Sequence, residues 1–381
     1  MASRPTPDPE TDLIMDPDLA ENCWPARLDD LKRSGRPLSL MARTMTRELF
    51  ETLKTRRTAT AGWTIARAIN TGVRNPSSTV GCHAGDRETY FDFKALFHPV
   101  IEGCHQGFRI GRDRHVSDPD AARIGVELSA TARDKVTSTR IRVARNLAGF
   151  PLNPGGTRNS REQIFRLLER VTSAFTGDLG GRMLRLADMS ARQRGELVAR
   201  GLLFRGRDRF QAASGHHRHW PHGRGLFLGP SGEFSLWINE GDQIRIVSME
   251  RGGDVHRVFD RLVRGIAAIE SGVRAQTGAG RAFLEDETLG MITCCPSNLG
   301  TAMRAGVHMR IPRLVERHGI GGIDRIAREM GCQARGGGGE HSRVADRVDI
   351  SNRRRLGLPE WALVADMIGC VNALARMEDA L

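Results

Sequence analysis

The spacing of apolar residues changes near residue 136, and this change limits the folds open to the chain. Before it, Met41, Met45, Leu49 and Leu53 recur every four residues, as on one face of helices. After it, residues 136–143 (VTSTRIRV) alternate apolar and polar side chains in the manner of a strand. A length of 381 residues suits two domains. The sequence therefore predicts an all-helical domain followed by a domain that contains a sheet.

Alternation returns at 233–239 and 243–249, which we expect to be strands. The turn-forming run Gly229-Pro230-Ser231-Gly232 predicts an antiparallel hairpin between 225–228 and 233–239. Further strands are expected at 289–295 and 306–311, and helices at 159–176, 190–202, 254–273, 312–331 and 359–379. The predicted fold class is α+β: a small all-helical N-terminal domain plus a larger domain with an antiparallel β-sheet flanked by helices.

Composition sets the expected boundaries. Residues 1–37 are rich in proline and aspartate and are interpreted as a loose extension, and residues 38–115 as the helical domain. Residues 116–135 are polar and predict a linker, which leaves 136–381 as the second domain.

The formal charge of +12 and the pI of about 10.3 indicate an anionic partner. The chain has lysines at positions 32, 54, 94 and 135 and none beyond them, so a phosphate site in the second domain must use arginine. The sequence contains no G-x-x-x-x-G-K-[ST] motif. Nucleic-acid binding is not expected, because the chain has one tyrosine and no recognition motif.

The seven cysteines form no C-x-x-C pair, which favours a reduced compartment over structural zinc. No stretch approaches the roughly 18 apolar residues of a membrane span, and the acidic N-terminal segment does not resemble a secretory signal. We therefore expect a cytoplasmic protein without a membrane span, as a monomer or homodimer.

Three clusters can carry chemistry, and each has a plainer interpretation. Arg140 and Arg142 point to one face of a strand and can bridge phosphates, or they can be solvated surface residues. Cys295 stands in a Pro- and Gly-bearing loop where its pKa could be lowered, although most cysteines are small buried apolar residues. The segment Arg335 to His341, with four glycines, is too flexible for a rigid element and can be a lid carrying Glu340 or simply a linker.

Taken together, these clusters resemble the phosphagen kinases, or ATP:guanidino phosphotransferases. The likeness extends from about residue 60 to the C-terminus. Its motifs are STRIRVARNLAGFPLNP at 138–154, WPHGRG at 220–225, LWINEGDQIRIVSM at 236–249, CPSNLGTAMRAGVHMRIP at 295–312 and DISNRRRLGLPE at 349–360.

The resemblance implies a role for each matching position. The arginines that would hold the phosphates of ATP or ADP are Arg140, Arg142, Arg245, Arg304 and Arg335. Cys295 and Glu340 match catalytic residues, and Glu240 and Asp242 match acidic residues near the water shell of Mg²⁺. The residues that would bind the acceptor are Ser78, Val80, Gly81 and His83.

Two features resemble arginine kinases, namely the short loop at 75–83 and the glutamate at 340. Three positions depart from the family pattern. Gly241 replaces a glutamate that grips the guanidinium, Leu228 replaces a histidine near the adenine, and His83 replaces a tyrosine that reads the acceptor.

The expected function is reversible transfer of the γ-phosphoryl group of Mg-ATP to a small guanidino substrate, L-arginine, giving a phosphagen for ATP buffering. A degenerate nucleotide-binding homologue, or a kinase for another guanidino acceptor including protein arginine, remains the alternative.

Overall fold

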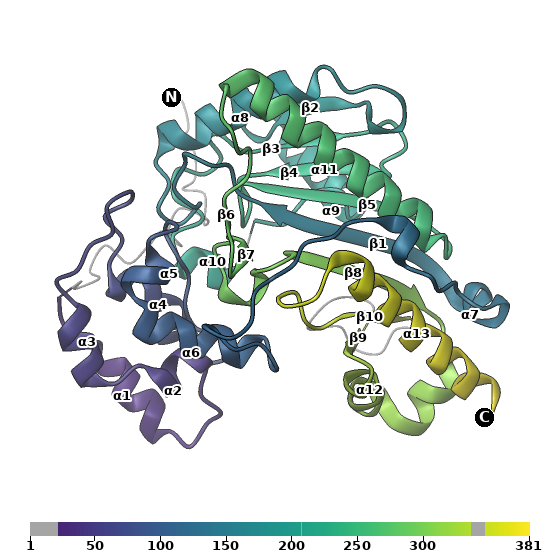
Figure 1. Cartoon of the computed structure of the whole chain (residues 1–381), viewed down its shortest axis with the longest axis horizontal. Coiled ribbons are helices and arrows are strands. Elements are labelled where there is room, and N and C mark those ends of the chain that lie inside the picture. The colour runs from purple at the N-terminus through teal and green to yellow at the C-terminus, as the bar shows by residue number, and fades with distance from the viewer. Residues whose placement is uncertain (1–21, 207, 337–346) are drawn as a thin grey trace, which may run out of the picture.

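The computed structural model describes residues 22–206, 208–336 and 347–381. A helical part lies beside a larger part built on a sheet, as Figure 1 shows. Among the described residues, no helix is both long and apolar enough to cross a bilayer.

The helical part begins with the N-terminal helices, and its apolar core also includes a few residues of the larger part, such as Ile292 and Leu299. Its helices are α1 (Ala26–Arg33), α2 (Leu40–Thr44), α3 (Arg47–Leu53), α4 (Ile65–Arg74), α5 (Thr89–Asp92) and α6 (Lys94–Cys104). The four-residue spacing from Met41 to Leu53 is divided between α2 and α3, because the Thr46 hydroxyl accepts from Leu49 N and begins a new helix. Trp63 and Phe97 are fully buried in this core.

An eight-stranded sheet forms the centre of the larger part, in the order β2-β3-β4-β5-β1-β8-β10-β9. Every neighbouring pair is antiparallel. The strands are β1 (Val136–Arg145), β2 (Arg182–Arg185), β3 (Gly225–Leu228), β4 (Phe234–Ile238), β5 (Ile244–Arg251), β8 (Met303–Met309), β9 (Cys332–Gly336) and β10 (Val348–Asn352). A separate small hairpin pairs β6 (Glu285–Asp286) with β7 (Gly290–Met291).

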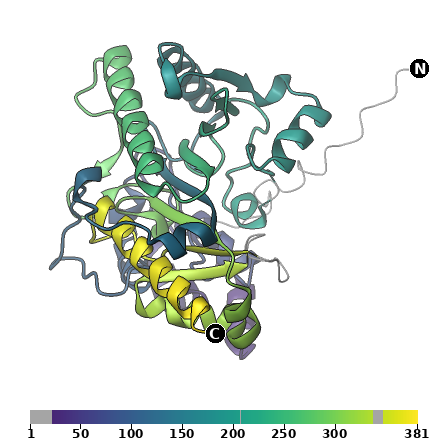
Figure 2. The ribbon, with the colours of Figure 1, turned by 90° about the vertical axis from the view of Figure 1, so that its right-hand side faces the viewer.

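Helices complete the larger part. They are η2 (Ala121–Arg123), α7 (Ala130–Lys135), α8 (Arg158–Thr172), η3 (Gly177–Leu179), η4 (Leu186–Asp188), α9 (Ala191–Ala199), α10 (Arg209–Ala213), α11 (Val255–Thr277), η5 (Pro296–Asn298), α12 (Pro312–Glu329) and α13 (Glu360–Asp379). The long helices α11 and α13, green and yellow in Figure 2, pack on the central strands. Apolar side chains such as Ile141, Val143 and Ile246 are buried in this core. The α+β prediction is confirmed.

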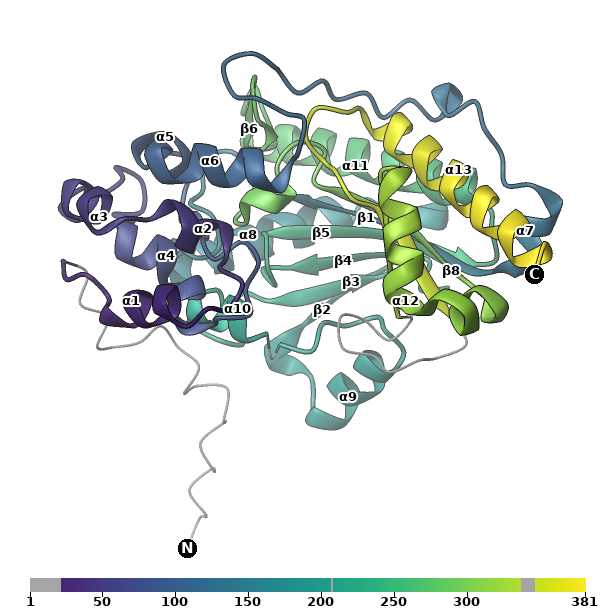
Figure 3. The same ribbon diagram turned by 90° about the horizontal axis from the view of Figure 1, so that it is seen from below.

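Alternate residues of the strands point away from that core. On β1, Ile141 and Val143 are buried, so Arg140 and Arg142 project from the opposite face. Figure 3 shows the helical part beside the ends of the central strands. The polar face of the sheet and the helical part together border the cleft described below.

Several local expectations were wrong. Only β7 is extended within 289–295, because the chain then turns into η5 at Pro296. Strands β2, β9 and β10 were not predicted. The segment 116–135 contains η2 and α7, and its role as a linker stays a prediction. Arg335 was assigned to a flexible segment, but it belongs to strand β9, where it is the Cα partner of Asp349 in β10.

The rest of that glycine-rich segment, residues 337–341 with Glu340, lies outside the described residues. The interpretation of the segment as a lid or a linker therefore stays a prediction. The domain boundaries also stay a prediction.

Candidate active site

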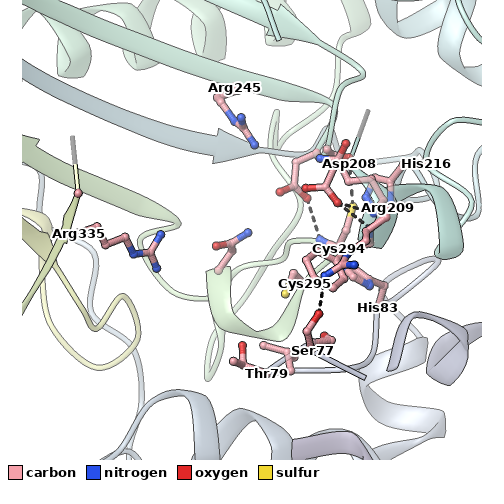
Figure 4. A pocket seen from close by; sticks show the side chains of 18 of the residues that line it. Ser77, Thr79, His83, Asp208, Arg209, His216, Arg245, Cys294, Cys295 and Arg335 are labelled. Carbon is pink, nitrogen blue, oxygen red and sulfur yellow. Dashed lines mark hydrogen bonds between the residues drawn. The ribbon is translucent and has the colours of Figure 1, made fainter. Parts of the chain in front are cut away.

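A cleft of about 740 Å³ lies between the helical part and the sheet part. One wall is the loop before His83, and the other includes Arg245 of β5 and Arg335 of β9. Cys294 and Cys295 lie between the two walls, as Figure 4 shows. Segments that are far apart in the sequence therefore meet at one cavity.

Strand register places the five predicted phosphate-binding arginines on one face. Arg142 is the Cα partner of Arg304, and Arg245 is the partner of Ala144, two residues along the same strand from Arg142. Residues directly opposite each other in a sheet share a face. Asp349 is the partner of His308 on one side and of Arg335 on the other, which extends the same face to the last strand. The order of the strands thus brings onto one face arginines that are far apart in the sequence.

These cations repel one another and are poorly hydrated. Burial lowers the pKa of Arg140 to about 10, and the nearby Arg245 and Arg304 contribute to the lowering. The pKa of Arg142 is lowered well below its usual value by burial and by the same neighbours. A cluster of buried like charges is stabilised by a polyanion. The face is therefore suited to a ligand with several negative groups.

Part of the charge is already balanced by carboxylates. Arg304 Nη2 donates to Asp349 Oδ2 at 2.6 Å, and its Nε donates to Ser351 Oγ at 3.1 Å. Arg245 Nη2 lies 2.9 Å from Glu240 Oε2. Arg140 and Arg245 also lie over the ring of Trp237, at 5.7 and 5.0 Å from its centroid. These contacts hold the guanidinium groups in place before any ligand binds.

Glu240 stays ionised although its side chain is largely removed from solvent. Burial on its own raises the pKa of Glu240, but Arg245, a hydrogen bond from Gln211 Nε2 at 3.0 Å and Arg142 outweigh it, and the pKa is lowered. Gly241 N also donates to Glu240 Oε2 at 2.7 Å. Both carboxylate oxygens are therefore occupied by donors from the protein.

The predicted metal residues do not form a direct cage. Asp242 Oδ1 accepts from Asn146 Nδ2 at 2.8 Å and from Cys294 N at 2.7 Å. Among the residues that the structure describes, no group of three or more His, Cys, Asp or Glu side chains is placed to hold an ion. Mg²⁺ commonly keeps its waters and binds through one or two carboxylates and substrate phosphates. The residues present fit a Mg²⁺ held in that way.

Cys295 lines the cleft at the start of η5, and its Sγ lies 3.2 Å from Ser297 Oγ. Burial raises the pKa of this thiol, and the hydrogen bond to Ser297 lowers it by less. The expectation of a lowered pKa is thus wrong for the structure without ligands, because desolvation of the thiolate dominates. An adjacent bound cation would act in the opposite direction.

The acceptor residues predicted in loop 75–83 are placed unequally. Ser78, Val80 and His83 line the cleft, but Gly81 does not. Gly81 has a φ of +87°, and a Cβ there would lie 2.5 Å from Ser39 Oγ, so its part is to shape the loop. His83 Nδ1 lies 3.0 Å from Thr71 Oγ1, and burial lowers the pKa of the ring to about 4. A neutral imidazole therefore faces the cleft.

The position of the missing glutamate has room for a side chain. A Cβ on Gly241 would lie 3.1 Å from Gln211 Nε2 and 3.5 Å from Arg245 Nη2. These are ends of flexible side chains, so a larger residue fits there after a small shift. Leu228 of β3, which also departs from the family pattern, packs with an apolar cluster and does not line the cleft.

Sequence reasoning missed several lining residues. They are Asp208, Arg209, Gln211, His216 and Asn298. Arg209 Nη2 donates to Ser77 Oγ at 2.6 Å and so ties α10 to the acceptor loop. The histidine-rich run at 216–222 was the sequence signal that could have indicated His216. Glu340 lies outside the described residues, so its predicted role stays a prediction.

Family models match both parts of the chain. The ATP:guanido phosphotransferase C-terminal catalytic domain matches residues 163–381, and the N-terminal domain of the same family matches residues 36–102. The chain belongs to the ATP:guanido phosphotransferase family. The resemblance inferred from the motifs is confirmed.

Members of this family that are similar to the chain differ in the acceptor that they are named for. An arginine kinase of Anthopleura japonica is 41% identical over 344 residues, which is 89% of this chain and 46% of that protein. The chain thus spans about half the length of that relative. A crystal structure of lombricine kinase matches with a TM-score of 0.82 and 34% identity, over 90% of this chain and 92% of that one. The duplicated taurocyamine kinase from Schistosoma mansoni matches with a TM-score of 0.84 and 31% identity, over 96% of this chain and 49% of that one.

Proposed function

We propose that the chain transfers the γ-phosphoryl group of Mg-ATP reversibly to a guanidino nitrogen of free L-arginine, giving a phosphagen that buffers ATP. The observation that carries the proposal is the row of arginines on one face of the sheet. Two of them, Arg245 and Arg335, line the cleft that also holds Cys295. Phosphoryl transfer needs positioning and charge neutralisation more than covalent chemistry, and guanidinium groups supply both.

In this proposal the arginines bind and orient the nucleotide. Arg140, Arg142 and Arg245 hold the phosphate chain from β1 and β5, while Arg304 of β8 and Arg335 of β9 approach the transferring phosphoryl group. The ion pair between Arg304 and Asp349 fixes the guanidinium direction beforehand. Mg²⁺ would neutralise phosphate charge, held by the phosphates and by water near Glu240 and Asp242.

The acceptor would bind between the loop and the cysteine. Ser78, Val80 and the neutral ring of His83 supply a wall for the uncharged and backbone groups of the acceptor. A guanidinium near Cys295 favours the thiolate, because an opposite charge lowers the pKa that burial raises. The thiolate would then hold the guanidinium in line with the γ-phosphorus. Glu340, by its match to the family, would receive the proton that the attacking nitrogen loses.

L-arginine is favoured as acceptor by the short loop at 75–83, by Glu340 and by similarity to a protein named arginine kinase. Neighbours named lombricine kinase and taurocyamine kinase support testing those acceptors too. Protein arginine is a weaker candidate, because the acceptor loop belongs to a compact helical part at the mouth of the cleft.

One observation favours a second candidate function. Gly241 leaves the cleft without the second carboxylate that grips the guanidinium. A chain that binds nucleotide but does not transfer phosphate would tolerate this loss.

Phosphorus NMR separates the two functions. The full chain with Mg-ATP and L-arginine, lombricine, taurocyamine or creatine should give a new phosphorus–nitrogen resonance with arginine. Nucleotide binding without any phosphoguanidine would instead favour the degenerate homologue.

A further inference from the structure

A second cavity of about 230 Å³ lies apart from the cleft and shares no lining residue with it. It is bordered by α11, by the segment at Ser117 and Pro119, by residues in and before β6 and in β7, and by the first residue of α13. Its volume is below the range of roughly 300–1,000 Å³ typical of drug-sized ligands. The cavity is therefore of the size for a small metabolite.

One buried cation lines this cavity. Arg145, at the end of β1, is only 3% exposed. Its Nη1 donates to the carbonyls of Ala144 at 2.8 Å and Thr301 at 3.0 Å, but its Nε has no hydrogen-bond partner among the described residues. Burial lowers the pKa of Arg145, and the nearby carboxylates of Glu360, Glu270 and Glu285 offset only part of that lowering. A buried arginine is normally paired with an anion.

The other charged side chains of the cavity are already engaged. Arg274 Nη2 lies 2.7 Å from Glu270 Oε1, and Arg281 Nη1 lies 3.1 Å from Glu285 Oε1. Glu360 accepts from Ser117 Oγ and from Asp118 N, each at 2.8 Å. Within the described parts of the chain, Arg145 is the lining cation with no carboxylate at ion-pair distance.

The remaining walls are apolar. Val263 and Ile266 of α11, Ala282 and Met291 line the cavity, and the Arg145 guanidinium lies 5.8 Å from the ring centroid of Phe283. The Arg145 guanidinium, which has no carboxylate at ion-pair distance and lies beside these apolar side chains, matches a ligand that has one anionic group on an apolar body. An oxyanion such as inorganic phosphate fits less well, because the two other arginines are held by glutamates.

We propose that this cavity binds a small organic carboxylate, with its carboxylate on Arg145 and its apolar body against α11. The carboxylate would accept charge-assisted hydrogen bonds from the Arg145 guanidinium. The site is separate from the nucleotide and acceptor cleft, so it is independent of the proposed function.

Calorimetry on the full chain tests the proposal with butyrate and with its neutral isostere butyramide. Excess ADP is present, so that the arginines of the cleft do not bind the probe. Butyrate should bind with one site per chain, and butyramide about tenfold more weakly or not at all, because it cannot form the charge-assisted hydrogen bonds. Equal affinity of acid and amide, or no binding of butyrate, would overturn the proposal.

A variant pair locates the site without disturbing the buried arginine. Ala267 lines the cavity, whereas the neighbouring Ala268 on the same helix does not. Ala267→Leu should weaken butyrate binding by about tenfold because it fills the space of the ligand. Ala268→Leu should leave the affinity unchanged. Butyrate binding that is equal in both variants would place the ligand elsewhere and contradict the assignment.

Discussion

Arg142 of β1 and Arg304 of β8 are directly opposed Cα partners in an antiparallel pair. Like charges in this arrangement destabilise a sheet. Asp349 offsets part of the repulsion through its ion pair with Arg304, but burial and the neighbouring arginines still lower the pKa of Arg142. The sheet therefore holds an electrostatic cost that a bound polyphosphate would relieve.

Nucleotide should accordingly stabilise the protein through its phosphates. At a concentration of 100 times its Kd, ADP should add about 2.7 kcal/mol to the free energy of unfolding. Differential scanning calorimetry should show a rise in Tm with ADP and almost none with adenosine at the same concentration. An equal rise with adenosine would mean that the arginine face does not bind the phosphates.

Arg304→Ala should reduce kcat much more than Arg56→Ala, which removes an exposed arginine of the helical part. A charge aimed at the transferring phosphoryl group acts mainly in the transition state. Its loss should cost about 3 kcal/mol, or about a hundredfold in rate. Steady-state kinetics compare the two variants, and similar activities would remove Arg304 from the site.

The reactivity of Cys295 should keep rising with pH in the protein without ligands. Burial raises the pKa of the thiol above its ordinary value of 9.0, so the neutral thiol persists at neutral pH and the thiolate grows in only at alkaline pH. Alkylation by iodoacetamide, followed by peptide mass spectrometry, measures this rate against that of the exposed Cys23. Ser297→Ala should slow it further, because the hydrogen bond to Ser297 lowers the pKa. A rate that levels off below neutral pH would show a thiolate already present.

Glu340→Gln should nearly abolish turnover and leave Mg-ATP affinity little changed. A guanidinium has a pKa above about 12, so a carboxylate must take its proton before the nitrogen attacks. The expected loss in kcat is about a hundredfold or more. Kinetics together with nucleotide titration separate the two effects, and an active variant with unchanged kcat would show that another group is the base.

Gly241→Glu should raise kcat for arginine, because it restores a second carboxylate beside Arg245. The side chain has room once Gln211 shifts slightly. Gly241→Gln is the matched control, since it adds the same volume without the charge. Equal rates in both variants would show that the gain, if any, is steric.

Local patterns predicted the local parts of the fold. The alternation at 136–143 and the turn at Gly229–Gly232 indicated β1 and the hairpin of β3 and β4, because both signals lie within a few residues. Strands β9 and β10 were missed because each has five residues and is stabilised by pairing with other strands. Their role in the sheet depends on contacts that a sequence window does not contain.

The candidate site, like the fold, was predicted where the signal is local and was missed where it depends on packing. Family motifs supplied Arg142, Arg304 and Cys295, and the sheet order explains why residues so far apart share a face. The raised pKa of Cys295 could not be read from its loop sequence, because burial depends on the packed structure. Gln211 was missed because it reaches the cleft from the short helix α10, which carries no motif of its own. His216 was missed although it begins a histidine-rich run, because that run matches no known type of site.

The most direct test of the account is the ratio of kcat/KM for L-arginine to that for creatine, measured with Mg-ATP on the full chain. The short loop at 75–83 and Glu340 predict that arginine is the better substrate. A higher kcat/KM for creatine would contradict the proposed acceptor. No transfer to arginine, creatine, lombricine or taurocyamine would contradict guanidino phosphotransfer by this chain and favour a nucleotide-binding protein.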